Sequence, residues 1–112
     1  MRVEFNKRKR TKYDIMFDIL YALSDGPLSK TRLIYKANLT YVIAEKYIPY
    51  LEKKNAIKKE GREYVITPIG RELLEKLKIY REKADEIRQL LVKIKQKLNT
   101  SNTTRNKSKQ IA

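Results

Sequence analysis

The feature that most constrains the fold is an alternating three- and four-residue spacing of apolar side chains through the last third of the chain. These side chains are Leu73, Leu77, Tyr80, Ala84, Ile87, Leu91, Ile94 and Leu98. No Gly or Pro interrupts the run, so it predicts a helix of about 28 residues, or ~40 Å, with a narrow apolar stripe. The rest of a 112-residue chain is too small to bury such a stripe. We therefore predict a homodimer whose interface is made by these residues.

The composition excludes several classes of function. The chain has no Cys and no His, which removes thiol and imidazole catalysis and nearly all zinc sites. We therefore expect no catalytic residues, no metal, no cofactor, no small-molecule substrate and no enzyme activity. No apolar stretch is long enough for a transmembrane helix, and no signal-like segment follows the first residue. We expect a cytoplasmic protein that is not inserted in a membrane.

The formal net charge of +14 indicates a polyanionic partner. Basic residues dominate the N-terminus, the middle of the chain and the last helix, and residues 13–28 are the acidic exception. A small protein needs a net charge of only about 2–8 for solubility. The excess favours nucleic acid or an anionic surface over solubility alone.

The first third of the chain predicts a basic arm and two helices. Residues 1–11 contain four adjacent cations and are expected to be flexible. Apolar residues at helical spacing predict a helix over residues 12–24, which ends at Ser24-Asp25-Gly26-Pro27. Ser29 is a suitable N-cap for a short helix over residues 30–36.

A third helix is expected over residues 41–54, with Thr40 as its N-cap. Its inward positions are Ile43 or Ala44, Tyr47 or Ile48, and Leu51. Pro49 lies inside this helix and predicts a kink or a break near residues 45–49, because proline removes a helical hydrogen bond.

Two strands and a long helix follow. Residues 57–59 and 64–66 flank a Gly-containing turn and predict a β-hairpin. Thr67-Pro68 is a typical helix start, with Thr as N-cap and Pro at the first helical position. The predicted segments are a flexible basic arm (1–11), a winged helix-turn-helix domain (12–67), a coiled-coil dimerisation helix (68–98) and a disordered polar and basic tail (99–112). The fold class is mainly α with a small hairpin, because three short helices followed by a two-stranded wing form a winged helix-turn-helix.

The third helix is the candidate recognition helix, whose N-terminal residues would reach base edges in the major groove. These residues are Thr40, Tyr41, Val42, Glu45 and Lys46. The stretch has no Arg, Asn or Gln for bidentate reading of guanine or adenine, which indicates weak sequence preference.

Cations on the flanking elements complete the predicted DNA-binding set. Its members are Lys7, Arg8, Lys9, Arg10, Lys12, Lys30, Thr31, Arg32, Lys36, Thr40, Tyr41, Lys46, Lys58, Lys59 and Arg62. The cations around the second helix suit a phosphate grip, although a solvated helix face would have the same composition. The hairpin cations are equally compatible with an ordinary charged hairpin. The eight tyrosines are expected mainly in the core rather than as stacking platforms.

The orientation of the predicted coiled coil depends on shape, because its flanking positions are nearly all cationic and offer few interhelical ion pairs. In a parallel pair Ala84 would face Ala84 and leave a thin layer. An antiparallel pair sets Ala84 against a bulkier residue, so we predict antiparallel pairing.

The run of residues 29–41, SKTRLIYKANLTY, resembles the helix-turn-helix signature of the small crenarchaeal "ten-a" DNA-binding proteins. Further matches are Tyr47-Ile48, Leu51, Glu60-Gly61 with Tyr64, and Thr67 with residues 70–74. The resemblance covers about residues 12–98. It implies winged-helix domains at both ends of an antiparallel coiled-coil dimer, chromatin association, and binding of double-stranded DNA with little sequence preference.

The function predicted from the sequence is a dimeric duplex-binding protein that organises the nucleoid by bridging or coating DNA. Two alternatives stay open at this point. One is a sequence-specific winged-helix transcription regulator. The other is an interaction module whose basic surface meets acidic protein or a membrane.

Overall fold

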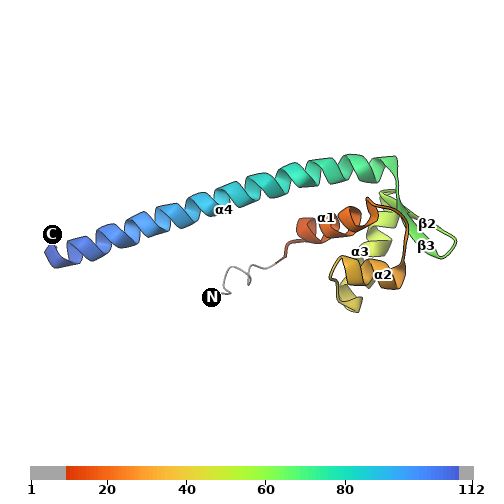
Figure 1. Ribbon diagram of the computed structural model, residues 1–112, viewed down its shortest axis with the longest axis horizontal. Coiled ribbons are helices and arrows are strands. Elements are labelled where there is room, and N and C mark those ends of the chain that lie inside the picture. The colour runs from red at the N-terminus through yellow and green to blue at the C-terminus, as the bar shows by residue number, and fades with distance from the viewer. Residues whose placement is uncertain (1–9, 109–112) are drawn as a thin grey trace. The chain divides into compact units, whose positions relative to one another are not determined.

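The computed structural model describes residues 10–108 and the side chains of residues 10–99. Its elements in chain order are α1 (Lys12–Leu23), β1 (Leu28–Ser29), α2 (Lys30–Lys36), α3 (Tyr41–Lys53), β2 (Ile57–Glu60), β3 (Glu63–Ile66) and α4 (Pro68–Ser108) (Figure 1). Three short helices, a hairpin and a long helix appear in the predicted order. The predicted fold class, a winged helix-turn-helix with a long C-terminal helix, is confirmed.

Each short helix begins at a capping side chain. The Thr11 hydroxyl accepts from Asp14 N at 3.1 Å, and the Asp14 carboxylate accepts from Thr11 N at 2.9 Å, which makes a capping box. The Ser29 and Thr40 hydroxyls accept from Arg32 N and Ile43 N, as predicted for helix N-caps. These bonds satisfy backbone N–H groups that the first helical turn leaves without partners.

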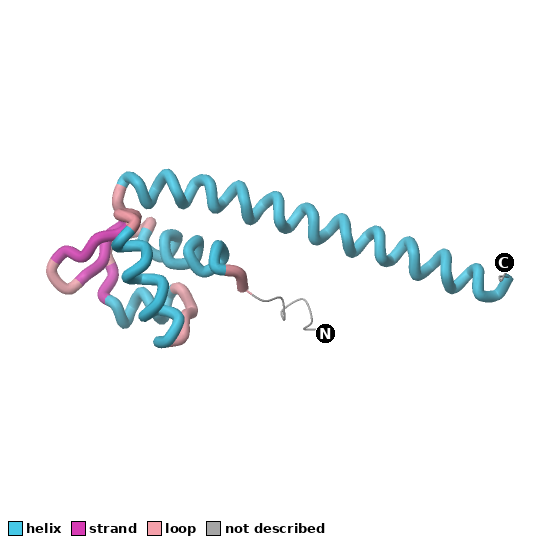
Figure 2. The backbone as a smooth tube through the Cα atoms, turned by 180° about the vertical axis from the view of Figure 1, so that it is seen from behind, coloured by secondary structure: helices cyan, strands magenta, loops and turns pink. Residues whose placement is uncertain are grey.

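A three-stranded antiparallel sheet has the order β1-β3-β2. The predicted hairpin pairs Ile57 with Ile66 and Glu60 with Glu63 (Figure 2). The additional strand β1 places Leu28 opposite Tyr64. A two-residue strand has too little sequence for an alternating pattern, so the sequence did not predict it.

One hydrophobic core joins the helices to the sheet. Its largest fully buried side chains are Ile19, Leu20, Leu23, Leu33, Ile48, Leu51 and Ile57. On α3 the inward residues are Ala44, Ile48 and Leu51, which agrees with the predicted face. Leu74 and Leu77 of α4 belong to the same core.

Of the kink or break predicted near Pro49, the break is absent, because α3 is one continuous helix from Tyr41 to Lys53. Proline leaves the carbonyl of Glu45, four residues earlier, without its helical donor. Glu45 and Pro49 both lie on the exposed face of α3. Water can therefore satisfy that carbonyl, and the helix continues through the proline.

Two compact units divide the chain between Ile79 and Tyr80. The first unit includes about three turns of α4, which the sequence assigned to the dimerisation segment. Within it Leu77 is buried and Leu73 is partly buried against the core. These two predicted interface residues are therefore already packed in their own domain.

The second unit consists of the remainder of α4. The helix continues to Ser108, beyond the predicted end at Leu98, so residues 99–108 are helical where disorder was expected. No Gly or Pro occurs there to end the helix. The last four residues of the predicted tail lie outside the described part. Within residues 10–108, none of the helices combines the length and the apolar character needed to cross a lipid bilayer.

Candidate nucleic-acid interface

The exposed face of α3 carries a ridge of four side chains opposite the buried face. Val42, Lys46, Pro49 and Lys53 are spaced by four, three and four residues, and all four are exposed. This spacing places them in one row along the helix. Val42 is 77% exposed, the largest value for an aliphatic side chain in the described part of the chain. We call these four residues the α3 ridge.

One flank of the α3 ridge is occupied by an ion pair between α2 and α3. The Lys30 ammonium pairs with the Glu45 carboxylate and lies 5.2 Å from the centroid of the Tyr41 ring. The hydrogen bond to Glu45 raises the pKa of Lys30 above its ordinary value of 10.5. Lys30 was predicted to grip phosphate, but in this structure its charge is engaged by Glu45.

The other flank of the α3 ridge is a pocket between α1 and α3. It has a volume of about 340 Å³ and is lined by Lys12, Tyr13, Met16, Lys46, Tyr47 and Tyr50. The Lys12 ammonium lies 5.3 Å from the centroid of the Tyr13 ring, and Lys46 lies 5.6 Å from that of Tyr47. Two of the predicted DNA-binding cations therefore line this pocket, and each lies against the face of a tyrosine ring.

The exposed side of α2 holds three more predicted residues. Thr31, Arg32 and Lys36 line an open hollow of about 500 Å³ together with Leu28 and Tyr35. Lys36 lies 3.5 Å from a carboxylate oxygen of Asp25, a long and exposed ion pair of small energetic weight.

The wing presents its cations on β2 and in the β2–β3 turn. Gly61 has a φ of 64°, the left-handed conformation that favours glycine, and Arg62 follows it in the exposed turn. Lys58 pairs with Glu60 at 3.2 Å, and Lys59 lies 5.6 Å from the centroid of the Tyr64 ring. Burial raises the pKa of the Tyr64 phenol above its ordinary value of 10.0.

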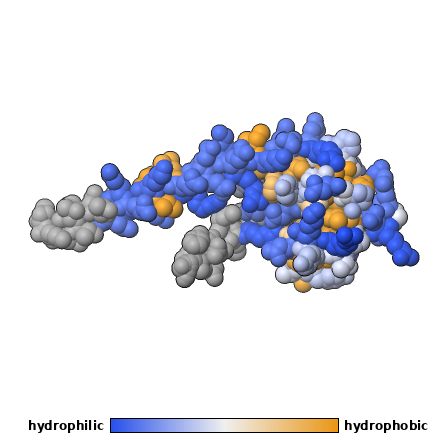
Figure 3. Space-filling view, in the orientation of Figure 1, coloured by the Kyte–Doolittle hydropathy of each residue, from blue (hydrophilic) through white to orange (hydrophobic). Residues whose placement is uncertain are grey.

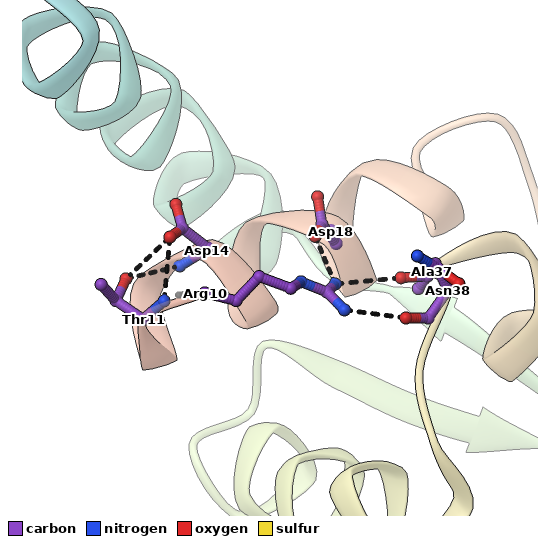
Figure 4. Close-up of polar contacts among 6 residues, drawn as sticks. All are labelled: Arg10, Thr11, Asp14, Asp18, Ala37 and Asn38. Atoms are coloured by element: carbon purple, nitrogen blue, oxygen red, sulfur yellow. Dashed lines mark hydrogen bonds and ion pairs between the residues drawn. The ribbon is translucent and has the colours of Figure 1, made fainter. Parts of the chain in front are cut away.

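Arg10 holds the helix-turn-helix turn rather than extending from the fold. Its guanidinium donates to the carbonyl oxygens of Asn38 at 2.7 Å and Ala37 at 3.1 Å, and it pairs with Asp18 of α1 (Figure 4). Asn38 has a φ of 56°, the left-handed conformation expected at this turn. The other cations of the predicted arm, Lys7, Arg8 and Lys9, lie outside the described residues.

The tyrosines differ from their predicted core role. Tyr64 is buried and Tyr47 is partly buried. The others are at least 40% exposed, namely Tyr13, Tyr21, Tyr35, Tyr41, Tyr50 and Tyr80. Helical spacing alone could not separate the core from its edge, because a tyrosine at the edge buries its ring partly and leaves its hydroxyl in water.

The predicted site residues thus fall into separate groups around α3. Lys46 lies on the α3 ridge, Lys30 and Tyr41 on one flank, and Lys12 on the other. Lys53 was missed by the sequence prediction. Its spacing of seven residues from Lys46, on the side opposite Ala44, Ile48 and Leu51, is the signal that would have identified it.

A family model described as winged helix-turn-helix matches residues 9–85, which is more than half of the chain. The chain belongs to the winged helix-turn-helix family. The match includes every described residue of the α3 ridge and its flanks. In helix-turn-helix DNA-binding proteins the second helix of the unit is the recognition helix. In this fold α3 occupies that position.

A solved winged-helix structure with a similar sequence is that of Sso10a-2, a DNA-binding protein from Sulfolobus solfataricus. The two are 36% identical, and the alignment covers 81% of this chain and 95% of that one with a TM-score of 0.59. The resemblance to the ten-a proteins is therefore confirmed. Another solved structure, the adhesin competence repressor of Streptococcus pyogenes, is 14% identical with a TM-score of 0.51 and shows the fold alone. It covers 97% of this chain and 88% of that one.

Two uncharacterized proteins of Methanocaldococcus jannaschii are also similar. One is 36% identical over 73 residues, covering 64% of this chain and 75% of the relative. The other is 42% identical over 69 residues, which are 62% of this chain and 33% of the relative. The second relative therefore has most of its length outside the matched region.

Proposed function

We propose that this chain binds double-stranded DNA as a homodimer with little sequence preference, and that it organises the nucleoid in the cytoplasm by bridging or coating duplexes. The observation that carries the proposal is the exposed α3 ridge, which presents Lys46 and Lys53 on the recognition helix of a winged-helix fold. Sso10a-2, which is similar over most of this chain, is a DNA-binding protein. The net charge of +14 suits a polyanionic partner.

Weak sequence preference follows from the chemistry of α3. The helix contains no Arg, Asn or Gln, the residues that pair bidentately with guanine or adenine. Glu45, which could accept from cytosine, is engaged by Lys30. Lysine is a compact point charge that attracts phosphate without fixing a base. Phosphate contacts then supply most of the affinity.

The proposed dimer uses α4 beyond the winged-helix core. Ile87, Leu91, Ile94 and Leu98 are between 44% and 59% exposed in the single chain, as are the neighbouring Leu90 and Val92. Figure 3 shows orange patches among the blue surface of the long helix. A row of exposed aliphatic side chains on a long helix favours burial against a second helix.

For an antiparallel pair we propose a register that uses the exposed part of the seam. Tyr80 would lie opposite Leu98 of the second copy, Ala84 opposite Ile94, and Ile87 opposite Leu91. Each layer then joins an a position to a d position, and the small Ala84 meets a large aliphatic residue. This register is centred on Gln89 and needs neither Leu73 nor Leu77, which are packed in the domain core.

A salt titration of DNA binding tests the proposal. A labelled duplex of random sequence and one from the protein's own promoter are titrated by mobility shift over a series of salt concentrations. We expect equal affinities, with log K falling linearly as log salt rises, because cations released from phosphates drive binding. The double variant Lys46→Gln/Lys53→Gln should lower the slope, and Lys93→Gln/Lys97→Gln is the charge-matched control on α4.

Two results would contradict the proposal and favour another function. Strong preference for the promoter duplex would favour a sequence-specific regulator. Absence of binding to any duplex at low salt would exclude a DNA-binding function and favour an acidic protein or a membrane surface as the partner.

A further inference from the structure

Val42 is an exposed aliphatic side chain at a position where a recognition helix enters DNA. It lies in the first turn of α3, two residues after the N-cap Thr40, and is 77% exposed. The first turn of a recognition helix is the part that contacts base edges. An apolar group at this position is exposed to water in the free protein, and its burial against a partner stabilises the complex.

Thr40 and Glu45, two polar neighbours of Val42, already have partners within the protein. The Thr40 hydroxyl accepts from Ile43 N at 3.1 Å in the helix cap. Glu45 pairs with Lys30, whose ammonium also lies over the Tyr41 ring. Lys46 is one turn further along the α3 ridge and would be drawn to phosphate. Val42 is therefore the exposed aliphatic side chain of the first turn, in a position to meet the groove floor.

The major groove offers one apolar group to such a side chain. Each thymine places its C5-methyl there, whereas the other three bases present hydrogen-bond donors and acceptors. We propose that Val42 packs against thymine methyl groups in the major groove and gives this chain a preference for thymine at the contacted step. The inference rests on the proposed DNA-binding function and adds a base-level determinant to it.

The size of the effect follows from the burial of one methyl group. Burying one methyl-sized group lowers Kd by about fourfold for each contact. A preference of this size is small beside the phosphate contribution, so it is compatible with binding to many sequences. It predicts a bias toward thymine-rich duplexes rather than a defined operator.

Replacing thymine by uracil in DNA tests the inference, because the two bases differ only by the C5-methyl group. Anisotropy titrations compare a random-sequence duplex with the same duplex carrying deoxyuridine. We expect about fourfold weaker binding of the deoxyuridine duplex. Replacing cytosine by 5-methylcytosine should strengthen binding by a similar factor, since it adds a methyl group at the equivalent position.

A double-mutant cycle separates Val42 from changes in duplex shape. The Val42→Ala variant should bind the thymine duplex more weakly than the unmodified protein does. The two proteins should bind the deoxyuridine duplex with nearly the same Kd. Ile69→Ala is the matched control, because Ile69 is also an exposed aliphatic residue, at 52%, on α4. It should leave the thymine-to-uracil ratio unchanged. Thermal unfolding of each variant verifies folding.

Equal Kd values for the thymine and deoxyuridine duplexes would overturn the inference and leave duplex binding intact. A thymine preference that persists in Val42→Ala would also overturn it, because the methyl group would then be read elsewhere. Failure to bind either duplex at low salt would instead contradict the proposed function itself.

Discussion

The Arg10 guanidinium donates to the carbonyl oxygen of Asn38 at 2.7 Å and so connects the start of α1 to the turn between α2 and α3. The same group reaches the Ala37 carbonyl and pairs with the Asp18 carboxylate. A left-handed turn residue and the end of α2 are thus held by one side chain. This contact makes Arg10 a structural residue of the helix-turn-helix unit.

Arg10→Ala should therefore destabilise the fold. We expect a loss of about 1–2 kcal/mol in the free energy of unfolding, because hydrogen bonds from a charged donor are lost at a partly exposed site. Urea denaturation measures the change. Arg10→Lys keeps the charge without the planar fork and should recover part of the loss. An unchanged denaturation midpoint for Arg10→Ala would show that the contact contributes nothing to stability.

The Lys30–Glu45 pair limits how many cations are available to DNA. In Glu45→Gln the carboxylate is gone and Lys30 is released, so random-duplex affinity should rise at low salt. The slope of log K against log salt should steepen by about 0.9, the value for one added phosphate contact. Glu52→Gln is the control, since it removes an equal charge from α3 and leaves the Lys30–Glu45 pair intact. Identical slopes for the two variants would mean that Lys30 contacts no phosphate.

Gly70 allows α4 to pass closely over the loop before β2. A Cβ at this position would overlap the Ala56 carbonyl oxygen and lie 2.8 Å from Ile66 Cγ1. Gly70→Ala should lower the free energy of unfolding by about 1–3 kcal/mol despite the better helix propensity of alanine. Urea denaturation of Gly70→Ala beside Ile69→Ala, an exposed neighbour, checks this. A stabilised Gly70→Ala variant would contradict the close approach.

The proposed dimer orientation can be tested by disulfide formation, since the chain has no Cys. In the antiparallel register Ile87 faces Leu91 of the second copy. A mixture of Ile87→Cys and Leu91→Cys chains should form a mixed disulfide on mild oxidation. Each variant alone should form little disulfide-linked dimer. Disulfides need Cα atoms within about 7 Å, so the method reads the register directly. Efficient crosslinking of Ile87→Cys to itself would indicate a parallel pair.

Sequence reasoning was most successful where the signal is local. Ser29, Thr40 and Pro68 mark helix starts by their own chemistry, and the structure begins helices at those points. The same reasoning missed β1, because its two residues form a strand only through the pairing of Leu28 with Tyr64. It also predicted a kink or a break at Pro49, and the sequence alone does not show that Glu45 and Pro49 lie on the exposed face of a continuous α3.

The candidate site was less predictable, because charge alone does not say what a side chain contacts. Arg10 and Lys30 look alike in a basic sequence, yet one holds a turn and the other pairs with Glu45. Both partners are distant in the chain. In the same way, the heptad spacing includes Leu77, which the tertiary fold uses in the domain core.

Backbone NMR of the 15N-labelled protein, titrated with a random-sequence duplex at low salt, tests the central claim most directly. We expect the largest shift changes at Val42, Lys46 and Lys53 of the α3 ridge and at Arg62 of the wing, with small changes at Ile87 and Leu91. The same pattern should appear with a second, unrelated duplex. Changes concentrated away from α3 and the wing, or no changes with either duplex, would contradict DNA binding through this face.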